Sequence, residues 1–149
     1  MSINNYFQCE FSALSENEAL ARSVVSAFAI PLDPTLDELS DLRTAVSEAV
    51  TNAIIHGYKD YEGEIPPVKM SCLLTDANEI VVCVEDFGCG IKDIQQARQP
   101  MYTSLPELER SGLGFTIMES FTDKLEVVSE AGKGTKIIMT KSFGAASEG

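Results

Sequence analysis

The first part of the chain predicts a strand followed by an amphipathic helix. Residues 6–12 are typical of a strand. Apolar residues then recur at helical spacing to about Phe28, which predicts a helix with one buried face. We expect a capping box at its start, with Ser15 as the N-cap and Glu18 three residues later.

A second, longer helix follows. Asp33 precedes Pro34, and proline is favoured at the first helical position, so we expect the helix to begin there. Leucine, valine and alanine then recur every three or four residues to about His56. Gly57 comes directly afterwards and can end the helix.

The later pattern predicts a sheet. Residues 68–72 alternate between apolar and polar side chains, as in a half-buried strand, whereas residues 80–84 are apolar throughout and predict a more buried one. Residues 125–129 and 136–140 predict a hairpin that turns around residues 130–133.

A long stretch between these strands has no regular pattern. Residues 86–114 are rich in glycine and polar side chains, with a short helix at most near 93–98, and such a segment is often a functional lid. A helix is expected over 113–121 and a frayed tail over 143–149. Strands and helices do not alternate strictly. The predicted fold class is therefore α+β, a two-layer sandwich with a mostly antiparallel or mixed sheet and helices on one face.

The composition fits one domain, residues 1–149, and its net charge limits the classes of molecule that it is expected to bind. The chain has 149 residues, of which 44% are hydrophobic, as in an ordinary globular domain. It carries 11 Lys and Arg against 23 Asp and Glu, a net charge of −12. This balance argues against nucleic-acid binding, which needs clustered basic residues. A basic protein, or a ligand whose charge a metal ion neutralises, fits better.

Nothing in the sequence predicts export or membrane insertion. No basic segment followed by an apolar one stands at the N-terminus, so we expect no signal peptide. The longest apolar run, residues 80–84, is far shorter than the ~20 residues of a membrane helix. The cysteines lack zinc or disulfide spacing and are expected to be reduced: Cys9, Cys72, Cys83 and Cys89. We expect a cytoplasmic protein.

Three polar residues spaced four apart lie on one face of the long predicted helix: Glu48, Asn52 and His56. A carboxylate and an amide oxygen suit a hard cation such as Mg²⁺, and a carboxylate beside it can act as a general base. The alternative is a solvated polar stripe, although asparagine is a poor choice for the middle of a helix. His56 alone is more typical of a residue at a helix end.

A second candidate is Asp86, which ends the buried strand and is followed by Gly88 and Gly90. Its carboxylate can accept a hydrogen bond, while the glycines let a ligand approach the backbone. A tight turn capped by the aspartate is the alternative.

Two further glycine-containing segments are weaker candidates. Residues 111–114 precede a helix, so their backbone N–H groups can bind phosphate. Residues 132–135 are the weakest of the four candidates, with a plain hairpin turn as the alternative. Neither segment completes a P-loop, and Asp93 stands where a dinucleotide fingerprint would need its third glycine.

The order of these segments resembles the gyrase, chaperone, histidine-kinase and mismatch-repair superfamily of ATP-binding domains, with its asparagine box, two glycine boxes and lid. Residues 46–57 (VSEAVTNAIIHG) and 106–119 (PELERSGLGFTIME) are more closely similar to the sporulation anti-sigma factors. These are small serine kinases that hold the forespore sigma factor F. The resemblance implies a Bergerat-type ATP-binding fold over essentially the whole chain.

The resemblance also implies a role for each position. Asn52 would bind Mg²⁺, and Glu48 would be the general base for a substrate serine. Asp86 would hydrogen-bond to the adenine amino group, supported by Thr135, and the two glycines after Asp86 would let the nucleotide approach.

The phosphates would be bound near the second glycine box. Backbone N–H groups would wrap them from Ser111, Gly112, Leu113, Gly114 and Phe115. Arg110 would face the terminal phosphate. The lid, about residues 91–110, carries Thr103 and Ser104 near its tip, and we expect it to order over ATP and to differ with ADP.

The implied partners are sigma factor F and an anti-anti-sigma factor, and the implied assembly is a homodimer. Arg22 is a candidate partner contact, with an ordinary ion pair to Glu18 as the alternative. A general-stress anti-sigma kinase, or a module that uses ATP only to hold the sigma factor, are alternatives. A detached histidine-kinase domain fits badly, because the segment before Glu48 leaves no room for a phosphoacceptor hairpin.

Overall fold

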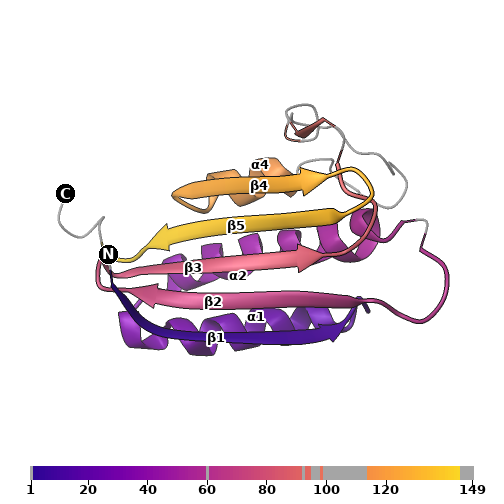
Figure 1. The fold of residues 1–149 in the computed structure, drawn as a ribbon. Coiled ribbons are helices and arrows are strands. Elements are labelled where there is room, and N and C mark those ends of the chain that lie inside the picture. The colour runs from indigo at the N-terminus through magenta and orange to yellow at the C-terminus, as the bar shows by residue number, and fades with distance from the viewer. Residues whose placement is uncertain (1, 60, 92, 95–97, 99–113, 145–149) are drawn as a thin grey trace.

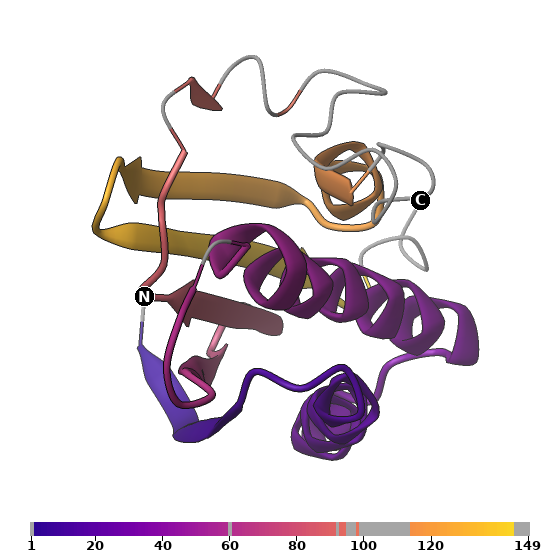
Figure 2. The same cartoon turned by 90° about the vertical axis from the view of Figure 1, so that its right-hand side faces the viewer.

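The protein folds as a five-stranded antiparallel sheet with helices packed on one face (Figures 1 and 2). The computed structural model describes residues 2–59, 61–91, 93–94, 98 and 114–144. Its elements, in chain order, are β1 (Ile3–Ser12), α1 (Asn17–Ala29), η1 (Ile30–Leu32), α2 (Leu36–Thr51), η2 (Asn52–Gly57), β2 (Pro67–Thr75), β3 (Glu79–Asp86), α4 (Gly114–Ser120), β4 (Lys124–Glu130) and β5 (Gly134–Ser142). The predicted α+β two-layer sandwich is confirmed.

The strands follow the order β1-β2-β3-β5-β4, and every neighbouring pair is antiparallel. β5 therefore lies between β3 and β4, which pairs the end of β3 with the beginning of β5. In this register Asp86 stands opposite Thr135. Two predicted site residues thus meet, although they lie far apart in the sequence.

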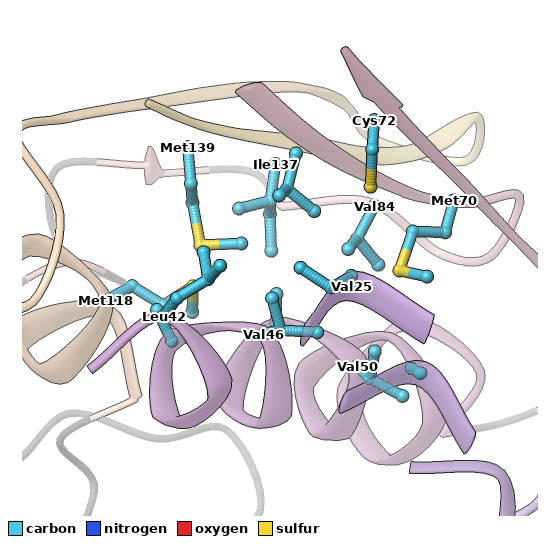
Figure 3. Packing of buried hydrophobic residues seen from close by; sticks show 14 of the residues in the cluster. Val25, Leu42, Val46, Val50, Met70, Cys72, Val84, Met118, Ile137 and Met139 are labelled. Carbon is cyan, nitrogen blue, oxygen red and sulfur yellow. The ribbon is translucent and has the colours of Figure 1, made fainter. Parts of the chain in front are cut away.

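The core fills the space between the sheet and the helices (Figure 3). Alternate residues of β2 and β3 are buried, which accounts for the period of two in their sequences. α2 contributes Val46 and Val50, and both are fully buried beneath the sheet. Burial of such a side chain contributes about 1.5–3 kcal/mol, so this helix is held firmly against β3 and β5.

The helix starts differ from the prediction. α1 begins at Asn17 after Glu16, and no side chain caps it, so the capping box expected at Ser15 is wrong. The capping box belongs to α2, where Thr35 Oγ1 accepts from the Glu38 backbone N–H (3.1 Å) and the Glu38 carboxylate accepts from the Thr35 N–H (2.9 Å). α2 therefore starts after Thr35, and the proline before it stays outside the helix.

The long helix changes character near its end. It reaches Gly57, as expected, but its last six residues form the wider π-helical turn η2. Such turns are rare and are frequent at functional sites. Here the wide turn begins at Asn52, one of the candidate site residues.

The strands and the ordered C-terminal segment extend further than the sequence predicted. Each predicted strand is present and is longer at one or both ends. Phe143 was expected in a frayed tail but is buried, and its N–H donates to the Asn78 carbonyl (3.1 Å). The Gly144 N–H donates to Glu38 (2.9 Å), so the tail is fixed at least to this residue. None of the helices in the described ranges is long and apolar enough to cross a membrane.

Candidate nucleotide site

Asp86 is the most deeply buried acidic residue at the candidate site, with only 2% of its surface exposed. Its Oδ1 accepts the Gly88 N–H at 2.9 Å. Burial raises the pKa of Asp86 to about 6, against the opposing effect of backbone hydrogen bonds from Gly88 and Thr135. A buried acceptor with a perturbed pKa at the end of a strand is typical of a binding site.

The glycines around Asp86 are required by the protein's own backbone. A Cβ atom at Gly88 would lie 1.7 Å from the Gly57 carbonyl oxygen, and one at Gly90 would lie 2.1 Å from the Glu130 carbonyl oxygen. At Gly134, it would lie 2.2 Å from the Asp86 carbonyl oxygen. Gly88 and Gly90 were expected to make room for a nucleotide, and Gly134 was assigned only to a weak hairpin-turn signal. The structure shows that they first make room for three chain segments to pack against one another.

Backbone hydrogen bonds connect the same three segments, which we call the glycine junction: η2 with Gly57, residues 86–90 after β3, and the β4–β5 turn at residues 130–134. The Cys89 N–H donates to the Gly57 carbonyl (2.8 Å), and the Cys89 carbonyl accepts from the Gly132 N–H (2.6 Å). The turn at residues 132–135, a weak candidate from the sequence, is therefore part of the candidate site, because it bonds to the segment after β3.

Thr135 is buried at 4% exposure and is joined to this junction by Ser129. Ser129 Oγ lies 2.9 Å from Thr135 Oγ1, donates to the Gly134 carbonyl (3.0 Å) and accepts the Ile91 N–H (2.7 Å). The predicted partner of Asp86 is thus fixed by a serine that the sequence pattern did not single out.

Glu48 lies on α2 near the beginning of α4, and Asn52, four residues later, shares its helix face. A Cβ atom at Gly114, the first residue of α4, would lie 3.6 Å from Glu48 Oε2, an ordinary van der Waals distance. Asn52 follows Glu48 by one turn and starts η2. Within the described ranges, no group of three or more His, Cys, Asp or Glu residues could hold a metal ion. An Mg²⁺ ion here would take few protein ligands, as is usual when it also binds phosphates and water.

Arg22 lies away from the glycine junction, on α1. Its guanidinium donates to Glu18 (2.8 Å) and to Ser47 Oγ of α2 (2.8 Å). The same carboxylate also accepts from Ser47 (2.7 Å) and Thr51 (2.7 Å). The ion pair with Glu18 that was the alternative for Arg22 therefore exists, and it joins the two helices.

Several predicted residues lie outside the described ranges: Thr103, Ser104, Arg110, Ser111, Gly112 and Leu113. Residues 95–97 of the short helix expected near 93–98 do so too, although the Arg98 N–H donates to the Ile94 carbonyl (3.0 Å), as in a helical turn. Phe115 stands in the first turn of α4, and its side chain belongs to the core.

Two site residues were missed because their signals are not local. Gly57 was expected only to end a helix, yet it also faces Asp86. Tyr58, which is 8% exposed, accepts the Phe87 N–H on its hydroxyl (2.8 Å) and donates to the Pro67 carbonyl (2.6 Å). It thereby ties the residue after Asp86 to the beginning of β2.

Comparisons with known proteins show the family of this chain. Residues 11–141 match the family described as histidine kinase-like ATPase domain. The chain is 57% identical over 141 residues to an anti-sigma F factor of Clostridium perfringens, which covers 95% of this chain and 99% of the relative. It is 54% identical to the anti-sigma F factor of Clostridium kluyveri, covering 97% and 99%.

A solved structure has the same fold. The crystal structure of the RsbU and RsbW domains of Rv1364c from Mycobacterium tuberculosis superposes with a TM-score of 0.65 at 15% identity. The match covers 94% of this chain and 32% of that one. With the buried acidic residue, the glycine junction and these relatives in view, we conclude that the chain belongs to the histidine kinase-like ATPase family and, within it, to the anti-sigma F factors.

Proposed function

We propose that the protein is a cytoplasmic serine kinase that binds and inhibits sigma factor F and uses Mg-ATP to phosphorylate a serine of an anti-anti-sigma factor. The observation that carries the nucleotide part is Asp86, a buried carboxylate held by backbone groups at the glycine junction. In this proposal its carboxylate accepts a hydrogen bond from the adenine amino group, and Thr135 borders the same end of the base.

The opposite end of the site would carry the phosphates and Mg²⁺. The Asn52 side chain, on the same helix face as Glu48, is the protein ligand that suits the ion. When bound, Mg²⁺ neutralises phosphate charge, which matters in a chain with a net charge of −12. Gly114 and Phe115 begin the helix that faces Glu48 and would border the phosphates.

Glu48 is the proposed general base. It would accept the hydroxyl proton of the substrate serine as the new bond forms between serine Oγ and phosphorus, while the bond from phosphorus to the ADP oxygen breaks. ADP would remain bound and hold the unphosphorylated anti-anti-sigma factor. Arg22 is the proposed contact for these protein partners. As the resemblance implies, we also propose a homodimer, which sedimentation analysis would test.

The decisive experiment measures transfer of labelled phosphate from Mg-ATP to the purified anti-anti-sigma factor. Glu48→Gln should abolish transfer, while sigma-factor binding and the rise in melting temperature with Mg-ADP persist. Glu16→Gln, at an exposed acidic position of the chain, is the matched control. Retained transfer in Glu48→Gln would show that the base is another group. No transfer by the unaltered chain, with sigma-factor binding intact, would favour a binding module that uses ATP only as a structural ligand.

A further inference from the structure

A groove of about 470 Å³ runs along the outer side of α2. Its lining includes Arg22 of α1 and, from α2, Leu36, Leu39, Arg43, Ser47 and Glu48. The first four α2 residues recur at intervals of three or four, with Glu48 directly after Ser47, and so form one stripe, turned away from the buried face of the helix. We call this feature the α2 groove. It ends at Glu48, the proposed base.

Arg43 is the cation of the α2 groove that no described residue binds. Arg22 already pairs with Glu18 at 2.8 Å and bonds to Ser47. Arg43 is exposed and makes no hydrogen bond or ion pair with any residue that the structure describes. In a chain with 23 acidic and 11 basic residues, an exposed arginine that pairs with none of the described acidic residues favours an acidic group from another molecule.

The far end of the groove is apolar. Leu36 is 86% exposed, the largest value among the exposed hydrophobic residues of the described chain, and Leu39 lies one turn further along. An exposed leucine on its own needs no explanation. In a groove that also holds Arg43 and a proposed catalytic carboxylate, it provides a contact for an apolar side chain.

We propose that the α2 groove receives the serine-bearing segment of the protein substrate in an extended conformation. The serine lies at Glu48, an acidic side chain pairs with Arg43, and an apolar side chain packs on Leu36 and Leu39. This inference rests on the proposed kinase function and adds to it the surface that selects the substrate sequence.

The spacing of the groove sets the sequence that it fits. With a helical rise of about 1.5 Å per residue, Arg43 lies about 7–8 Å along α2 from Glu48, and Leu36 about 18 Å. An extended chain advances about 3.3 Å per residue. The acidic side chain therefore stands about two residues from the serine, and the apolar one about five or six residues from it on the same side.

The test combines steady-state phosphorylation with equilibrium binding. The substrate is the purified anti-anti-sigma protein, its KM is measured with Mg-ATP, and its Kd is measured by calorimetry with Mg-ADP. Arg43→Glu should raise both by about tenfold or more, because a desolvated charge pair becomes a repulsion. The kcat and the rise in melting temperature with Mg-ADP should stay unchanged. Lys124→Glu on the edge strand β4 makes the same charge change elsewhere and should alter neither constant.

Each possible result either supports or overturns the proposed role of the α2 groove. Unchanged KM and Kd in Arg43→Glu would overturn the proposal, as would weakened sigma-factor binding with unaltered substrate binding. If changing the substrate's acidic residue to arginine restores its binding to the Arg43→Glu variant, the pairing is supported directly. If the unaltered chain binds the substrate through Arg43 but transfers no phosphate, the groove stands and the kinase function fails. If it does not bind the substrate at all, the groove proposal fails as well.

Discussion

Gly57 and Asp86 lie so close that a Cβ atom at position 57 would be 2.6 Å from the carboxylate carbon of Asp86. The wide turn η2 brings this glycine to the end of β3. Because Gly57 has no side chain, the Asp86 carboxylate fits beside it without a steric clash. A residue that ends a helix is thus also part of the wall of the proposed adenine site.

Gly57→Ala should displace the Asp86 carboxylate. We expect the added methyl group to lower the free energy of unfolding by about 1–3 kcal/mol and to reduce the rise in melting temperature with Mg-ADP. A double-mutant cycle checks the cause, because the same substitution should cost much less in an Asp86→Ala background. Equal costs in both backgrounds would show that the carboxylate is not what the methyl group displaces.

The pH dependence of nucleotide binding should follow Asp86. Its pKa of about 6 lies above the usual 3.8, so its contribution to the stability of the nucleotide-free protein is complete below pH 3.8 and is lost as the pH rises through 6. In the proposed binding mode the ionised carboxylate accepts from adenine, so the ADP-induced melting shift should weaken as the pH falls through 6.

Asp86→Asn is the control for this pH dependence, because the titration of ADP itself remains in both proteins. The variant should bind ADP more weakly at pH 8 and lose the additional dependence near pH 6. Identical pH profiles in the variant and the unaltered chain would contradict a role for this carboxylate.

Tyr58→Phe should loosen the connection between β2 and the segment after β3. The substitution leaves the Phe87 N–H and the Pro67 carbonyl without their hydroxyl partner. Urea denaturation should show a loss of about 1–3 kcal/mol, the usual cost of unsatisfied half-buried groups. Tyr61→Phe, at a tyrosine that is 51% exposed, should change the free energy of unfolding by only a few tenths of a kcal/mol.

Glu18→Ala should weaken the contact between α1 and α2. Its carboxylate accepts from Arg22, Ser47 and Thr51, all part-buried, and these donors would lose their shared acceptor. We expect a loss of about 1–3 kcal/mol by thermal or urea unfolding. Glu16→Ala, at the exposed neighbouring carboxylate, should have little effect, and a similar loss there would point to helix propensity instead.

The fold was predictable because hydrophobic periodicity is a local signal. The alternation in β2 and β3 and the helical stripe of α2 reflect directly which face is buried. The capping box was misplaced because Ser15 and Glu18 match a local pattern, whereas the Glu18 carboxylate is used by α2 across the helix interface. The residues around Ser15 do not show that side chains of α2 compete for the Glu18 carboxylate.

The candidate site residues were chosen from the sequence as positions, and their roles stay predictions. The segments containing Glu48, Asn52 and Asp86 were found from residue type and spacing. The reason for the glycines was not, since Gly88 and Gly134 meet backbone atoms from distant parts of the chain. Only the strand order, with β5 between β3 and β4, brings these segments together.

The glycine junction also has a consequence for synthesis on the ribosome. Asp86 is made early, but its strand neighbour Thr135 and the turn that bonds to Cys89 come almost fifty residues later. A nascent chain that has emerged only through β3 therefore lacks one wall of the proposed adenine site. At the proposed site, nucleotide would stabilise the protein only after β5 has been added, so ligand binding would favour chains whose sheet is already complete.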